Sequence, residues 1–174
     1  MNGKKHVVLI GLPGSGKTTV GRLVAEELKA GFADIDAILI RKEGRPISLM
    51  FAEKGEQAFR QMETKEMDAA VANQPAVIAP GGGWAAQPGA LEAHKAACYF
   101  IYLKTRPDTA SERAAPTGTR PLLMGEDPVQ RMRDLIKERE SFYIKADAKV
   151  ETDRKTPQQV AAEVVRLARQ GAGW

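Results

Sequence analysis

The sequence predicts an α/β fold in three layers (αβα), with a five-stranded parallel sheet covered by helices on both faces. Short apolar runs typical of strands alternate with helical patterns along the chain, and this alternation indicates βαβ units. The expected strands are 6–10, 32–35 (the weakest), 76–79, 98–103 and 148–152. The expected helices are 17–30, 56–73, 108–115, 128–146 and 157–170.

The chain length and composition indicate one globular domain, 1–174, able to bury about two-thirds of its unfolded surface. Hydrophobic residues make up 43% and charged residues 28%, which is ordinary for globular proteins. No apolar run approaches the ~20 residues that span a bilayer. The apolar stretch 7–10 after two lysines is too short for the core of a signal peptide. We therefore expect a cytoplasmic location and no membrane partner.

The charge and the rare residue types argue against several classes of partner and site. The chain has 26 Lys and Arg against 22 Asp and Glu, with no basic run interleaved with aromatic residues. This modest excess suits a small anionic substrate and argues against nucleic acid. The lone cysteine, Cys98, lies in an apolar run, where packing is its usual role. Two histidines and one cysteine do not make up a zinc site of the usual kind.

A phosphate-binding loop connects the first expected strand to the first expected helix. Residues 11–18 read GLPGSGKT and match G-x-x-x-x-G-K-[ST] in this strand–loop–helix context. The glycines let backbone N–H groups point at phosphate oxygens, and the helix adds the positive end of its dipole. Lys17 is expected to reach the β- and γ-phosphates, and Thr18 to bind Mg²⁺. The expected ATP-binding residues here are Gly14, Ser15, Gly16, Lys17, Thr18 and Thr19.

This loop alone does not separate kinases from GTPase switches or motor ATPases. The N-K-x-D pattern that reads the base in G proteins is absent from the sequence. A long apolar strand that ends in the aspartate of an ordinary Walker B motif is also absent. The carboxylate that assists magnesium must therefore come from elsewhere.

Two aspartates, Asp34 and Asp36, follow the first expected helix directly. On a strand they would point the same way, because side chains alternate between the two faces. The carboxyl end of a parallel strand is also the edge where α/β proteins bind ligands. Beside a phosphate-binding loop we interpret the pair as a site for a cation or a substrate hydroxyl. A pair of surface aspartates in a turn is the alternative.

Further motifs follow in a fixed order. They are GRPIS at 44–48, GEQAFRQME at 55–63, GGG at 81–83, RPLL at 120–123 and RESFY at 139–143. In this order and spacing the chain resembles the shikimate kinase family, a branch of the nucleoside-monophosphate-kinase-like P-loop proteins, from the first strand to about residue 152. The resemblance implies a P-loop kinase fold with a substrate-binding helical region at about 34–63 and a lid at about 114–127.

The resemblance also implies roles for single residues. The implied catalytic residues are Lys17, Asp36, which would hold the acceptor hydroxyl and act as general base, and Arg120, which would close over the phosphates from the lid. Arg113 would lie against adenine, and Asp34 would position Mg²⁺ together with Thr18. The implied substrate-binding residues are Asp36, Arg60, Glu63, Gly82, Gly83 and Arg139. Among these, Arg60 and Arg139 would clamp the shikimate carboxylate, and Glu63 would orient Arg60.

Two of these arginines also make sense from the residues themselves, because a guanidinium presents a planar fork suited to a carboxylate. Arg60 and Glu63 lie three residues apart on an expected helix, close enough to pair, with a plain surface ion pair as the alternative. Arg139 shares a helix with an apolar stripe and should face inward, where an anion would offset its burial; a snorkelling side chain is the alternative. The stripe consists of Met132, Leu135, Ile136, Phe142 and Tyr143.

Three positions depart from the family's pattern. Ile40 stands where an acidic residue is common, Pro80 where a hydroxyl residue precedes the three glycines, and Trp84 where a small residue is usual. We expect ATP chemistry to be unaffected by these changes. We expect Trp84 to pack on a neighbouring helix rather than line the pocket, because tryptophan is usually mostly buried.

The leading hypothesis is a monomeric kinase that transfers the γ-phosphoryl of Mg-ATP to the 3-hydroxyl of shikimate. The alternatives are a related kinase acting on gluconate or a nucleoside monophosphate, and a nucleotide-binding regulator without transfer activity. The regulator is disfavoured because a degenerate site has no evident need of five retained charged residues. These are Asp34, Asp36, Arg60, Arg120 and Arg139.

Overall fold

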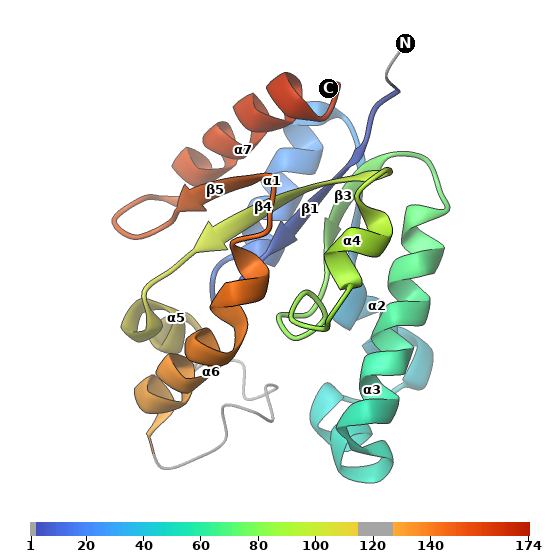
Figure 1. Cartoon of the computed structure of the whole chain (residues 1–174), viewed down its shortest axis with the longest axis vertical. Helices are drawn as coiled ribbons and strands as arrows, with labels where there is room; N and C mark the ends of the chain where they lie inside the picture. Colours follow the sequence, from blue (N-terminus) through green and yellow to red (C-terminus); the bar gives the residue numbers. More distant parts are fainter. Residues whose placement is uncertain (1–2, 115–126) are drawn as a thin grey trace.

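The computed structural model describes residues 3–114 and 127–174, and its five strands form one parallel sheet (Figure 1). The strand order is β2-β3-β1-β4-β5, which confirms the expected five-stranded parallel sheet. The strands are β1 (His6–Ile10), β2 (Gly31–Asp34), β3 (Ala76–Ala79), β4 (Cys98–Lys104) and β5 (Ala148–Glu151). Arg120 and nearly all of the expected lid lie outside the described residues.

Helices cover both faces of the sheet, so the expected three-layer arrangement is confirmed (Figure 1). Helices α1 and α7 pack on one face, and the remaining helices contribute to the core on the other. The helices are α1 (Lys17–Leu28), α2 (Ile35–Glu43), α3 (Ile47–Val71), α4 (Ala90–His94), α5 (Pro107–Ala114), α6 (Pro128–Tyr143) and α7 (Pro157–Gly171). Within the described ranges, no helix combines the length and the apolar character needed to cross a membrane.

The central strand β1 is buried along its whole length because each of its faces meets a separate core. Val7 and Leu9 pack with α1 and α7, whereas Val8 and Ile10 pack with the helices of the opposite face. In the parallel ladder, Val8 lies between Ile78 of β3 and Phe100 of β4. A continuous apolar run is what a strand covered on both faces requires.

Strand β2 ends one residue earlier than expected, and the prediction that Asp34 and Asp36 share one face of a strand is wrong. The strand ends at Asp34, and α2 begins at Ile35, so Asp36 lies in the first helical turn. The Asp34 side chain caps α2 by accepting a hydrogen bond from the backbone N–H of Ala37 at 3.1 Å. An aspartate at this position satisfies a backbone donor that the helix leaves unpaired, which favours helix over strand.

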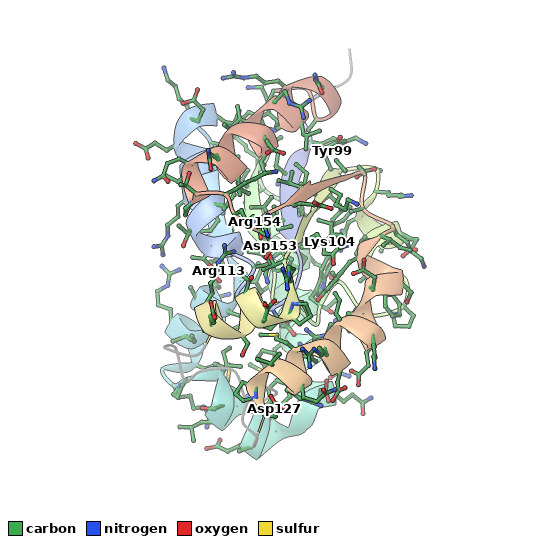
Figure 2. The ribbon with its side chains drawn as sticks, turned by 90° about the vertical axis from the view of Figure 1, so that its left-hand side faces the viewer. Tyr99, Lys104, Arg113, Asp127, Asp153 and Arg154 are labelled. Atoms are coloured by element: carbon green, nitrogen blue, oxygen red, sulfur yellow. The ribbon has the colours of Figure 1, made fainter. Side chains whose placement is uncertain are left out.

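Two further helical segments were not expected. Helix α3 begins at Ile47, nine residues before the expected start at 56, and is bent at Gly55, whose φ is 82°. The short helix α4 follows the glycine-rich segment and lies before β4. Helix α6 begins where expected, with Asp127 accepting a hydrogen bond from the Gln130 N–H, and ends at Tyr143 rather than at 146 (Figure 2).

Candidate active site

The phosphate-binding loop lies at the carboxyl end of β1, in the middle of the sheet, and leads directly into α1. Gly14 has φ 79°, and a Cβ at this position would overlap the backbone carbonyl of Ala110 in α5. Gly16 is the N-cap of α1, with φ 94°. Glycine is therefore required for both the path of the loop and its close packing. The start of α1 points its unpaired N–H groups at the space that the loop encloses.

Two polar side chains of the loop are buried in positions suited to an anion. The Lys17 ammonium donates hydrogen bonds to the carbonyls of Gly11 at 2.8 Å and Leu12 at 2.9 Å. The Ser15 Oγ is buried and has no hydrogen-bond partner among the described residues. A buried hydroxyl without a partner is costly, so this loop favours a ligand that brings acceptor oxygens.

A cavity of about 430 Å³ extends from this loop toward the end of β5. Arg113 lines it from α5, and its guanidinium donates to the Thr152 hydroxyl at 3.4 Å (Figure 2). The structure thus places Arg113 and the loop residues in one pocket, as expected for a nucleotide site. Sequence reasoning missed Thr152, Lys155 and Pro157, which complete the lining. These three residues could have been found from their position just after a strand, because that is the ligand-binding edge of a parallel sheet.

The two residues expected to serve a metal ion are in direct contact. The Thr18 hydroxyl donates a hydrogen bond of 2.7 Å to the Asp34 Oδ2. Two oxygen groups beside a phosphate site fit Mg²⁺, which keeps several waters and needs few protein ligands. Within the described part of the chain, no group of three or more His, Cys, Asp or Glu side chains forms a larger metal site.

Asp36 reaches the glycine-rich segment from α2, and Glu63 reaches it from α3. A Cβ on Gly81 would lie 3.0 Å from the Asp36 Oδ1 and 2.5 Å from the Glu63 Oε2. Although Asp36 is helical, it lies at the same glycine segment as Glu63. Glycine at position 81 makes this close approach of two carboxylates to the backbone feasible.

Both arginines of the expected clamp approach the same glycine segment. A Cβ on Gly82 would lie 3.1 Å from the Arg139 Nη1, and one on Gly83 would overlap the Arg60 guanidinium. Arg139 is 6% exposed, which confirms that it faces inward. The Arg60 side chain is 15% exposed and forms a salt bridge with the fully buried Glu63, so the surface-pair alternative is wrong. The geometry brings Arg60, Glu63 and Arg139 together from two helices.

A second cavity, of about 700 Å³, lies between these two arginines. Its lining includes Arg60, Gly83 and Arg139, together with Arg131 and Glu138, which sequence reasoning missed. Arg131 and Glu138 share one face of α6 with Arg139, so their helical spacing from Arg139 could have indicated that they line the same cavity. A hollow lined by inward guanidiniums suits a small carboxylate.

Two of the three departures from the family's pattern, Ile40 and Trp84, lie outside these contacts or serve packing. Ile40 is 37% exposed on α2. Trp84 is 1% exposed and packs against His94 of α4 with ring centroids 5.8 Å apart, so it packs on a neighbouring helix as expected. Cys98 is buried, and burial raises the pKa of its thiol to about 12, which excludes it as a nucleophile at neutral pH.

Comparisons with known proteins agree with this site. A family model described as shikimate kinase matches residues 13–169. A shikimate kinase of Symbiobacterium thermophilum is 40% identical over 163 residues, covering 92% of this chain and 94% of the relative. The solved structure of shikimate kinase from Acinetobacter baumannii in complex with shikimate has a TM-score of 0.91 at 34% identity, covering 97% of this chain and 95% of its own. The chain therefore belongs to the shikimate kinase family and is an ATP-dependent phosphotransferase.

Proposed function

We propose that the protein transfers the γ-phosphoryl of Mg-ATP to the 3-hydroxyl of shikimate, giving shikimate 3-phosphate and ADP. The observation that carries this proposal is the pair Arg60 and Arg139, which line one cavity beside Gly82 and Gly83. Shikimate is a small carboxylate that carries hydroxyl groups, so it matches two inward guanidiniums next to backbone donors. The bound shikimate of the Acinetobacter baumannii relative supports the same acceptor.

In this proposal the acceptor carboxylate lies between Arg60 and Arg139. Glu63 holds Arg60 in place through a hydrogen bond that its Oε1 accepts whether the carboxyl is ionised or neutral, so the guanidinium fork is oriented before the acceptor arrives. The N–H groups of Gly82 and Gly83 donate to the acceptor. The acceptor hydroxyl lies beside Asp36, which takes up its proton as it attacks the γ-phosphorus.

The nucleotide occupies the cavity between the phosphate-binding loop and the end of β5. Lys17 leaves its contacts with the loop carbonyls for the β- and γ-phosphates, and Arg113 lies against the adenine. Thr18 and Asp34 would hold the Mg²⁺ used by this family, which neutralises charge on the phosphates when bound. What this chain supplies is mainly alignment and positive charge, as phosphoryl transfer requires.

A panel of acceptors tests the proposal. ADP release is measured with shikimate, gluconate and nucleoside monophosphates at saturating Mg-ATP, with a no-acceptor control for ATP hydrolysis. We expect turnover with shikimate alone, and mass spectrometry should identify shikimate 3-phosphate. Turnover with gluconate but not with shikimate would contradict the proposed acceptor. ATP binding without transfer to any acceptor would indicate a regulator instead.

We propose that the protein is a monomer in the cytoplasm and that its partners are ATP and shikimate. A buried free cysteine fits a reducing compartment. Sedimentation of the purified protein tests the monomer directly.

The affinity for shikimate is expected to depend on the protonation of Glu63. Burial raises the pKa of Glu63 from 4.5 to about 7, the charge of Arg60 opposes this shift, and Asp36 adds to it. Below pH 7 a neutral Glu63 leaves the charge of Arg60 to the acceptor carboxylate. Above pH 7 the ionised Glu63 competes for that charge. We therefore expect the KM for shikimate to rise about fivefold from pH 6 to pH 8.

The variant Glu63→Gln is the matched control, because it keeps the side-chain shape and stays neutral at every pH. Its KM for shikimate should stay nearly constant over the same range, while the KM for ATP follows the unaltered protein. A flat profile in the unaltered protein, or an equal rise in Glu63→Gln, would contradict the role given to Glu63.

A further inference from the structure

Tyr143 is the last residue of α6 and is completely buried. Its hydroxyl donates a hydrogen bond of 2.6 Å to the carbonyl oxygen of Gly82, a residue 61 positions earlier in the chain. The roles described above leave this residue unassigned. Its contact nevertheless falls on the glycine segment that both arginines of the acceptor cavity approach.

Arg139 lies one helical turn before Tyr143 on α6. Burial raises the pKa of Tyr143, and the charge of Arg139 opposes the rise. The phenol therefore stays neutral and donates its proton to the carbonyl oxygen of Gly82. Tyr143 thus connects the glycine segment to the helix that carries Arg139.

The hydrogen bond from Tyr143 to Gly82 fixes the orientation of the whole peptide unit between Gly82 and Gly83, and not only that of the Gly82 carbonyl. The carbonyl of Gly82 and the N–H of Gly83 belong to the same planar peptide unit and point in opposite directions. Holding the Gly82 oxygen therefore sets the direction of the Gly83 N–H, which faces away from Tyr143. This matters because glycine has no side chain to restrict its backbone, and the peptide would otherwise rotate easily.

Arg139 has part of its guanidinium available for a ligand. The Arg139 Nη1 is buried and has no hydrogen-bond partner among the described residues. It lies 3.1 Å from where a Cβ on Gly82 would be, so it sits at the glycine segment. A buried side chain that is already confined loses little freedom when it binds a carboxylate.

We propose that Tyr143 is a positioning residue for the acceptor: it fixes the Gly82–Gly83 peptide unit against α6, so that the Gly83 N–H meets the acceptor together with the Arg139 guanidinium. This inference rests on the proposed function, because it concerns the same acceptor cavity. Tyr143 itself does not touch the reacting atoms. Its removal should therefore weaken acceptor binding more than it slows the chemical step.

Tyr102 provides a matched control in the same core. It is 1% exposed, its ring centroid lies 5.1 Å from that of Tyr143, and its hydroxyl donates to the Glu140 Oε2 at 2.5 Å. The variants Tyr143→Phe and Tyr102→Phe each remove one buried, hydrogen-bonded hydroxyl and keep the ring. Both should fold, and their melting temperatures should fall by similar amounts.

Steady-state kinetics with shikimate and ATP separate the two variants. Tyr143→Phe should raise the KM for shikimate about tenfold, with the KM for ATP unchanged and kcat within about threefold of the unaltered protein. Tyr102→Phe should leave all three values nearly unchanged.

A shikimate KM in Tyr143→Phe within twofold of that of the unaltered, active protein would overturn this inference alone. An equal rise of this KM in Tyr102→Phe would also overturn it, because the effect would then reflect general loosening of the core. Failure of the unaltered protein to phosphorylate shikimate would overturn the proposed function itself, and this inference with it.

Discussion

Replacing Asp36 by asparagine is expected to lower kcat about 10²–10⁴-fold while leaving ATP affinity unchanged. The asparagine keeps the size of the side chain and its ability to accept a hydrogen bond, but it does not take up a proton at neutral pH. Asp36 lies beside Gly81 and Glu63 in the acceptor region and is separate from the lining of the nucleotide cavity. The loss should therefore appear in turnover, measured by ADP release at saturating shikimate.

Asp68→Asn is a suitable control for the Asp36 experiment, because Asp68 is exposed on α3 and pairs with His94 at 3.0 Å. It should leave turnover unchanged. Binding of ATP to Asp36→Asn, measured by titration calorimetry, should match the unaltered protein. Normal turnover in Asp36→Asn would remove this carboxylate from the mechanism, and loss of ATP binding would show that its role is structural.

The strands could be predicted well because their signal is local and strong. The bounds of β1 and β3 agree with the expected ranges, since both are apolar runs whose ends are marked by polar or glycine-rich segments. Burial on both faces of a parallel sheet leaves little room for polar residues inside such a run. The order of the strands in the sheet was not predicted, because it depends on pairing between segments far apart in the sequence.

The helical region that carries Asp36 could not be placed correctly from local pattern. Only Ile35 and Leu39 of α2 are buried, and so short an apolar pattern does not distinguish a helix from a strand that continues. The signal that was overlooked is the cap: Asp34 at the start of α2 and Gly44, with φ 67°, at its end. Reading these two residues as helix boundaries would have placed Asp36 in the first turn.

The functional residues divide in a similar way. Arg139 could be predicted because a charged residue beside an apolar stripe requires an explanation. Arg60 could be predicted from the family's motif and from its spacing of three residues to Glu63.

The contacts that Thr152 and Tyr143 make could not be predicted, because their partners lie far away in the sequence. The hydroxyl of Thr152 meets Arg113 of α5, and that of Tyr143 meets the glycine segment after β3. Such contacts form only when the chain folds, and they produce no periodic pattern in the sequence.

Replacing Arg139 by alanine is expected to raise the KM for shikimate about 30-fold or more, with a smaller change in kcat. The side chain is 6% exposed, lines the cavity opposite Arg60 and presents a nitrogen without a hydrogen-bond partner among the described residues. Without Arg139, the acceptor carboxylate still pays the desolvation cost of entering the cavity. It loses much of the electrostatic attraction that offsets this cost when two guanidiniums are present. Arg133→Ala is the matched control, because Arg133 is exposed on the same helix.

The Arg139→Ala variant also tests whether the groups of the cavity act as one electrostatic unit. The charge of Arg139 lowers the pKa of Glu63, against the larger effect of burial. Removing that charge should therefore shift the rise of the shikimate KM to higher pH, whereas Arg139→Lys, which keeps the charge, should leave the midpoint in place. Arg139→Lys should still raise the KM, because an ammonium lacks the planar fork that fits a carboxylate. An unchanged midpoint in Arg139→Ala would mean that the charge of Arg139 does not act on Glu63, and the two residues would then contribute to acceptor binding independently.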